Sequence, residues 1–206
     1  MKTELGRVVR TVTAGLLALL ASGCSLPLNG KGEVQTYDFG PFLQAKASGG
    51  RLTQPVLVYE VTAPAWMESP AIFYRLAYVD PSRPLAYASS RWVMPPAALL
   101  SARLRQRLSG AGGGVILPSD GLRAPAALRM ELEEFTQVFD AEAKSRAVVR
   151  MRASLAGPRS LIAQKSFSVD RVAPTPDAEG GVRALSAASD EALAQVLAWM
   201  ASSLKN

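Results

Sequence analysis

The sequence contains no histidine and a single cysteine, Cys24. Without histidine it lacks the commonest general base and the commonest metal ligand. One thiol can form neither an internal disulfide nor a zinc site of cysteines and histidines. No serine lies in the Gly-x-Ser-x-Gly pattern of hydrolases, and the glycines at 110–114 lack the lysine of a phosphate-binding loop. These absences favour a binding or structural protein over an enzyme, and we expect no metal or cofactor.

Carboxylates gather between residues 131 and 142, and a pair of them could in principle serve hydrolysis. Strand alternation, however, places Glu131 and Glu133 on the same outward face, which is ordinary solvated sheet surface. We therefore expect no catalytic role for this group. Its members are Glu131, Glu133, Glu134, Asp140 and Glu142.

Long hydrophobic runs are also missing. The apolar run at residues 11–21 is too short for a helix to cross a bilayer about 30 Å thick, and no other run approaches the required length. The run at residues 11–21 is preceded by the basic residues Lys2, Arg7 and Arg10. A basic segment, a short apolar stretch and then small residues form the pattern of a secretory signal. We therefore expect export from the cytoplasm.

The apolar run leads into the letters ASGC, which end in Cys24 and resemble the lipobox of bacterial lipoproteins. In that pattern the thiol receives a diacylglycerol, the signal is removed before the cysteine, and the freed amine is acylated. The sequence thus predicts a signal peptide over residues 1–23 and a lipidated tether over 24–33. The alternative is an ordinary signal peptide followed by a free cysteine.

Lipidation at Cys24 would anchor the chain to a membrane without a transmembrane helix. Several acyl chains, at about 0.8 kcal/mol per buried methylene, give stable attachment. Ser25 follows the cysteine where inner-membrane lipoproteins of this pattern have aspartate, which favours the periplasmic face of the outer membrane.

The charge balance is mildly basic, with 23 lysines and arginines against 17 acidic residues and a net charge of +6. This excess suits a neighbourhood of anionic lipid headgroups. It does not indicate nucleic acid, which calls for clustered basic residues with groove-reading or stacking motifs. We expect no nucleic-acid partner.

Residues 34–206 are expected to form one α+β domain. Alternating and β-branched stretches predict strands, each ended by glycine, proline or a polar turn. Residues 126–155 read as a long hairpin, and a change of parity predicts a bulge near Glu133 and Glu134. Further strands are expected at residues 35–39, 56–61, 71–80, 85–94 and 161–169, with a short extended segment at 115–120.

Two amphipathic helices are expected. Pro95 and Pro96 open the first, in which Leu100, Leu104 and Leu108 form an apolar stripe. The last helix is predicted to begin at Ser189 as its N-cap, after a loop. Its stripe comprises Leu193, Val196, Leu197, Met200 and Leu204. The expected architecture is a single, mostly antiparallel twisted sheet with two amphipathic helices packed on one face.

Two surfaces are candidates for contact with a partner or a lipid. The first is a set of arginines in a stretch without acids: Arg91, Arg103, Arg105 and Arg107, with Arg83 before them. Guanidinium groups suit phosphates, but the same side chains could simply flank the leucine stripe of a helix. The second is Trp66 and Met67, in a proline-bracketed loop. These residues either pack onto the sheet or face a partner.

The order of these segments resembles the ABC-type transport auxiliary lipoprotein family, the PqiC-like lipoproteins. The most specific part spans residues 72–108: a tyrosine strand, then Arg91 and Trp92, a proline pair and the leucine helix. The letters YDFGPF soon after the lipobox and the closing helix with LAWM support it. The family has no catalytic residues to carry over, so only Cys24 transfers, as the anchor.

The resemblance implies a non-catalytic accessory part of an MCE-type lipid transport system. Such systems contain an inner-membrane ATPase and permease and a periplasmic MCE-domain protein, which the lipoprotein would bind from the outer membrane. Two other classes stay open. One is an assembly or plug lipoprotein for an outer-membrane β-barrel, and the other is a carrier that holds an acyl chain between sheet and helices.

Overall fold

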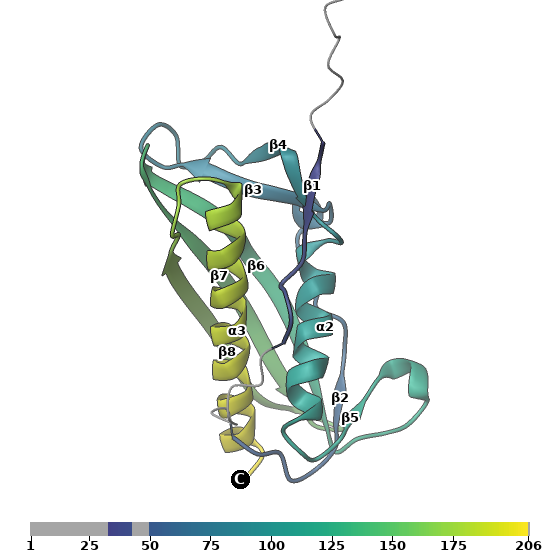
Figure 1. Cartoon of the computed structure of the whole chain (residues 1–206). Coiled ribbons are helices and arrows are strands. Elements are labelled where there is room, and N and C mark those ends of the chain that lie inside the picture. The colour runs from purple at the N-terminus through teal and green to yellow at the C-terminus, as the bar shows by residue number, and fades with distance from the viewer. Residues whose placement is uncertain (1–32, 43–49, 206) are drawn as a thin grey trace, which may run out of the picture. The chain divides into compact units, whose positions relative to one another are not determined.

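The computed structural model describes residues 33–42 and 50–205. The predicted signal peptide, Cys24 and almost all of the predicted tether lie outside these residues. Two long helices lie along the same face of one sheet, so the expected α+β fold is confirmed (Figure 1). Among the described residues, no helix is both long enough and apolar enough to cross a membrane.

Three long strands form an antiparallel meander that ends at one edge of the sheet. They are β6 (Ala126–Ala141), β7 (Lys144–Ala156) and β8 (Leu161–Val172), and among the described strands β8 pairs only with β7. The pairing of β6 with β7 shifts between Leu132 and Glu134, so the bulge expected from the change of parity is confirmed. Before the bulge the buried positions alternate on even numbers such as Leu132, and after it every residue from Phe135 to Phe139 is buried.

Shorter strands extend both halves of β6. The second half pairs in parallel with β3, β3 pairs with β4 antiparallel, and β4 pairs with β1 in parallel. The first half pairs in parallel with β2, which pairs in parallel with β5. These strands are β1 (Gln35–Tyr37), β2 (Val56–Val58), β3 (Ala71–Leu76), β4 (Leu85–Trp92) and β5 (Val115–Ile116).

The sheet is therefore more mixed than the sequence suggested, although its long pairings are antiparallel. The parallel pairings have a topological cause. Strands β2 and β6 are separated in the chain by three strands and an α-helix, and a connection of that kind allows a parallel pairing that a tight hairpin does not. Hydrophobic alternation within one strand does not indicate which distant strand it pairs with, or in which direction.

The first helix, α2 (Pro96–Ser109), matches its prediction. Pro96 occupies its first turn, and Leu100, Leu104 and Leu108 are fully buried against the sheet. The glycine-rich segment after α2 passes close to the backbone of the segment before β2. Gly113 has a φ of +77°, and a Cβ there would lie 2.5 Å from the carbonyl oxygen of Gln54.

The second helix, α3 (Ala178–Ser203), begins well before Ser189, so the predicted start was wrong. Its N-cap is Asp177, whose carboxylate accepts a hydrogen bond from the Gly180 amide at 2.8 Å. Ser189 is buried inside the helix and donates to the carbonyl oxygen of Leu185. Gly180 and Gly181, which the sequence interpretation places in the loop, lie in the first turn of the helix. Gly181 lets the helix pack closely on β6, because a Cβ there would lie 2.1 Å from the side-chain oxygen of Gln137.

Candidate functional site

Arg103 is an internal residue and is not part of the outer surface of α2. Its side chain is 4% exposed, and it donates hydrogen bonds to the carbonyl oxygens of Phe39 at 2.6 Å and Gly40 at 2.8 Å. Its Nε lies 3.5 Å from the carboxylate of Asp190 on α3. The guanidinium also lies over the ring of Phe42, 5.4 Å from its centre. Arg103 thus joins both helices to the segment that follows β1.

The other two helix arginines also have partners within the protein. Arg107 lies 3.5 Å from the same Asp190 oxygen and is mostly buried, while Arg105 pairs with Glu60. Arg105 is thus partly exposed beside the leucine stripe, whereas the side chain of Arg103 is buried and that of Arg107 mostly buried, which neither sequence interpretation described. Of the five arginines named from the sequence, Arg83 and Arg91 are exposed and form no ion pair with a described residue, and Arg91 lies on β4.

Trp66 and Met67 lie in the short helix η1 (Ala65–Met67) and have opposite environments. Met67 is fully buried, whereas Trp66 is 39% exposed. The Trp66 ring meets Phe73 of β3 edge-on, with 5.2 Å between ring centres. The guanidinium of Arg75 lies 5.7 Å from the centre of the Trp66 ring. Met67 is therefore a core residue, and Trp66 is a partly exposed surface residue.

The structure brings Trp66 and Arg91 to the same stretch of β3. Arg91 is in register with Ala71, and the pairing with β4 then shifts between Ala71 and Phe73. By strand alternation Ala71 and Phe73 share a face of β3, and Trp66 packs on Phe73. Ile72 between them is fully buried, so this face points away from the core. We call Trp66, Phe73 and Arg91 the Trp66–Arg91 surface.

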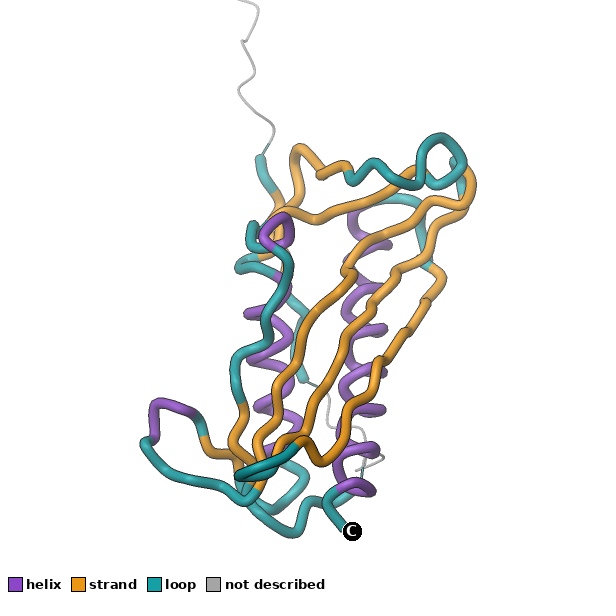
Figure 2. The backbone as a smooth tube through the Cα atoms, turned by 180° about the vertical axis from the view of Figure 1, so that it is seen from behind, coloured by secondary structure: helices purple, strands orange, loops and turns teal. Residues whose placement is uncertain are grey.

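Figure 2 shows the molecule from behind, with the strands in front of the two helices. This face of the sheet carries a network of ion pairs. Glu131 and Glu133 of β6 are exposed, as alternation predicted, and arginines pair with four of the five acids between residues 131 and 142. The pairs are Arg150–Glu134 at 2.6 Å, Arg152–Glu131 at 2.6 Å, Arg152–Glu133 at 3.6 Å, Arg146–Asp140 at 3.2 Å and Arg75–Glu134 at 3.9 Å. Arg146 also pairs with Asp170 of β8 at 2.5 Å.

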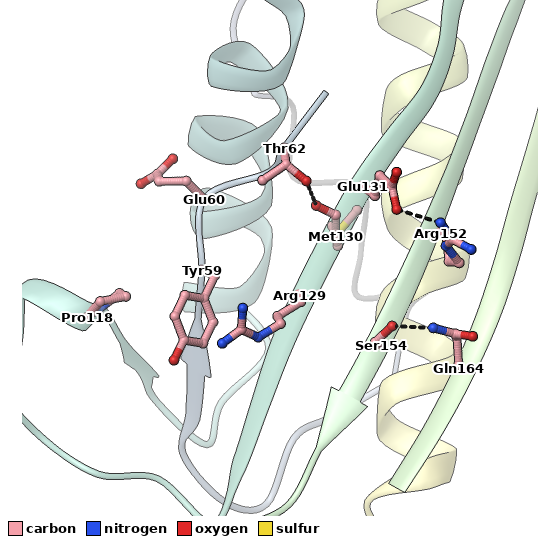
Figure 3. A pocket seen from close by; sticks show the side chains of 10 residues that line it. All are labelled: Tyr59, Glu60, Thr62, Pro118, Arg129, Met130, Glu131, Arg152, Ser154 and Gln164. Carbon is pink, nitrogen blue, oxygen red and sulfur yellow. Dashed lines mark hydrogen bonds and ion pairs between the residues drawn. The ribbon is translucent and has the colours of Figure 1, made fainter. Parts of the chain in front are cut away.

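A groove of about 580 Å³ opens on this face, between the ion pairs and the chain that follows β2. Arg129 of β6 is in register with Ser154 of β7, and Ser154 is in register with Gln164 of β8. Tyr59 forms the opposite wall, and Pro118 of the short helix η2 (Pro118–Asp120) lies at the rim (Figure 3). We call this feature the Arg129 groove. It is lined by Tyr59, Glu60, Thr62, Pro118, Arg129, Met130, Glu131, Arg152, Ser154 and Gln164.

Comparison with known families decides the broad role of this arrangement. The model of the family described as ABC-type transport auxiliary lipoprotein component matches residues 37–197. The chain belongs to this family. It is therefore an accessory lipoprotein associated with ABC-type transport, and membrane attachment in bacteria is the setting that the family indicates. None of the curated proteins matches this auxiliary lipoprotein.

Solved structures share the fold of this auxiliary lipoprotein at low sequence identity. Protein XCC0632 from Xanthomonas campestris is 17% identical with a TM-score of 0.73, covering 84% of this chain and 97% of its own. An uncharacterised protein is 16% identical with a TM-score of 0.61, over 84% and 99%. The hypothetical protein CT253 from Chlamydia trachomatis is 11% identical with a TM-score of 0.51, over 75% and 100%. Similarity at this level establishes the fold alone.

Sequence reasoning missed the Arg129 groove of the auxiliary lipoprotein. Alternation correctly places Arg129 outward, but an outward charge on a strand is ordinary. The register with Ser154, a neutral residue, and the approach of Tyr59 depend on the pairing of β2, β6 and β7. A faint signal was available, because Arg129 is a charged β6 residue whose expected partner on the return strand is not of opposite charge.

Proposed function

We propose that this auxiliary lipoprotein is anchored through Cys24 to the periplasmic face of the outer membrane. There it acts as a non-catalytic accessory component of an MCE-type ABC lipid transport system and binds the periplasmic MCE-domain protein. The ATPase and permease belong to the same system. The family match over residues 37–197 is the observation that carries the proposal. The lipobox at Cys24 and the serine after it support the anchor and its membrane.

The anchor keeps the domain close to the membrane. A tether over residues 24–33 reaches at most about 35 Å when fully extended. Attachment also raises the effective concentration of the domain for a partner that is docked at the same membrane. Both effects suit a subunit whose task is to hold a periplasmic transport protein in place.

The Trp66–Arg91 surface is the proposed contact with the MCE-domain protein. Tryptophan and arginine are enriched among the residues that dominate binding at protein interfaces. Trp66 is pre-positioned by Phe73, so little conformational freedom would be lost on binding. Arg91 adds a cation that no described carboxylate neutralises.

The packing under the helices favours a protein-binding role over the carrier alternative. A carrier needs space for an acyl chain between sheet and helices. The side chains at that boundary are instead closely packed and fully buried, among them Leu100, Leu104, Leu185, Leu193 and Val196. Opening the layers would expose this core to water, at about 25 cal/mol for each Å² of apolar surface.

Crosslinking from the proposed contact tests this function. A photo-crosslinking amino acid replaces Trp66 in the intact, lipidated protein, and adducts are identified by mass spectrometry after purification from gently solubilised membranes. The matched control places the same amino acid at Leu161, an apolar residue of β8 that is 59% exposed. A second control is a Cys24→Ala form exported by an ordinary signal.

We expect an adduct with an MCE-domain protein from position 66 and none from position 161. The Cys24→Ala form should give a weaker adduct, because it loses the advantage of attachment. Recovery of an outer-membrane β-barrel protein, or of lipid alone, would contradict the proposal and favour the assembly or carrier function.

A further inference from the structure

Arg129 differs from the other arginines on the helix-free face. Arg75, Arg146, Arg150 and Arg152 each pair with at least one carboxylate. Arg129 forms neither an ion pair nor a hydrogen bond with any residue that the structure describes. The lining carboxylates cannot neutralise it without giving up other cations, because Glu131 is paired with Arg152 and Glu60 with Arg105. The groove therefore contains one cation whose charge is not balanced locally.

The aromatic ring of Tyr59 orients this cation. The guanidinium carbon lies 4.1 Å from the centre of the ring, which is a close cation–π contact. Such stacking occupies a face of the planar guanidinium and leaves its N–H edge available for an acceptor. In Figure 3 the Arg129 side chain extends along the groove beside Tyr59. The stacking limits the conformational entropy that Arg129 would lose on binding a ligand.

Ser154 supplies a second donor in the lining of the groove, on the side of Arg129 away from Tyr59 (Figure 3). Ser154 and Arg129 are directly opposite each other in the antiparallel pair of β6 and β7. The Ser154 hydroxyl oxygen accepts a hydrogen bond from the Gln164 amide at 2.8 Å, which leaves its own O–H free to donate. The groove thus offers guanidinium N–H groups and a hydroxyl, and both are donors.

We propose that the Arg129 groove binds the phosphate group of a small phosphorylated ligand. The guanidinium edge can donate two parallel hydrogen bonds to the oxygens of one phosphate, and the Ser154 hydroxyl is a further donor for the rest of the ligand. A water molecule takes about 30 Å³ of the liquid, so a groove of about 580 Å³ has room for an organic group attached to the phosphate. This site is separate from the Trp66–Arg91 surface and does not rest on the proposed transport function.

Calorimetric titration of the intact, lipidated protein in neutral, phosphate-free detergent micelles tests the site. The probes are inorganic phosphate and glycerophosphoethanolamine, which is a phospholipid headgroup without acyl chains. We expect Arg129→Gln to weaken binding of the better probe at least about tenfold, since hydrogen bonds to a charged group would be lost. Arg83→Gln makes the same charge change on an exposed turn and should stay within about twofold of the wild type.

Two further variants separate the ring from its hydroxyl. Tyr59→Phe keeps the ring and should bind like the wild type, whereas Tyr59→Leu removes the stacking and should weaken binding. Unfolding midpoints of all variants check that each one folds, and Arg129 is exposed enough for substitution to be tolerated.

The two probes identify the source of the phosphate. Tighter binding of glycerophosphoethanolamine would assign the site to a lipid headgroup, and equal binding would assign it to phosphate alone. Absence of binding by both probes would overturn the proposal. So would an Arg129→Gln variant that folds and binds like the wild type.

Discussion

Arg103 on α2 donates a hydrogen bond to the carbonyl oxygen of Phe39 at 2.6 Å. The Phe39 ring in turn packs edge-on against Trp92, with 5.6 Å between the ring centres, at the edge of the sheet where β1 meets β4. The buried guanidinium of Arg103 therefore connects that edge of the sheet to α2. An arginine that sequence spacing assigns to the surface is a structural element of the core.

Replacing Arg103 by methionine should lower the free energy of unfolding by about 2–4 kcal/mol. The carbonyl groups of Phe39 and Gly40 would lose a buried donor, and Asp190 would lose one of its two cations. Arg105→Met is the matched control, because that more exposed ion pair should contribute less than about 1 kcal/mol. Urea unfolding of both variants measures the difference. Equal losses would show that Arg103 has no special structural role.

Gly181→Ala should destabilise the protein although alanine is the better helix former. Alanine would contribute about 1 kcal/mol through helix propensity. Its Cβ, however, would lie 2.1 Å from Oε1 of Gln137, and overpacking of this kind costs about 1–3 kcal/mol. Gln137 cannot move away freely, because it accepts a hydrogen bond from Tyr87 and donates one to Ser145, both at 2.9 Å.

The melting temperature of Gly181→Ala should therefore fall, whereas Gly157→Ala should leave it nearly unchanged. A Cβ on Gly157 meets its nearest atoms at 3.6 Å, which is an ordinary contact. A Gly181→Ala protein as stable as the wild type would mean that the helix shifts without cost.

Acid should weaken the start of α3 through Asp177. The hydrogen bond from the Gly180 amide, followed by that from Thr175, lowers the pKa of Asp177 below its ordinary value of 3.8. Because this pKa is lower in the folded state, the stabilisation is present above the unfolded pKa. It is lost as the pH falls through the folded pKa. Asp177→Asn keeps a capping side chain that does not titrate.

Thermal unfolding between about pH 6 and pH 2 checks this prediction. The wild type should lose more stability than Asp177→Asn over the acid part of this window, below about pH 4. Glu142→Gln, which changes an exposed carboxylate in the turn between β6 and β7, should follow the wild type. Parallel curves for wild type and Asp177→Asn would argue against a titrating cap.

Met67 and Trp66 should respond differently to truncation. Met67→Ala creates a cavity at a fully buried position and should cost about 2–5 kcal/mol of stability. Trp66→Ala removes a partly exposed ring and should cost less, while it weakens recovery of the transport partner. Denaturant midpoints together with the purification described above separate the two effects. If Trp66→Ala loses as much stability as Met67→Ala and still recovers the partner, Trp66 is a core residue.

Local patterns were sufficient for features that depend on neighbours in the chain. The leucine stripe of α2 follows from its spacing, and the bulge in β6 follows from a change of parity between Leu132 and Phe135. The outward acids of β6 follow from the same alternation. The lipobox at Cys24 is also a local pattern, and anchoring there stays a prediction because Cys24 lies outside the described residues.

The sequence by itself thus determined the α+β class and which face of most elements is buried, because the spacing of apolar residues within a segment indicates both. Only the tertiary structure decided that Gly181 continues a helix against Gln137, that Arg103 points inward to Phe39, and that Tyr59 meets Arg129. In each case the partner is far away in the chain. The preference of one residue is then overruled by packing or hydrogen bonding with another, which no local pattern encodes.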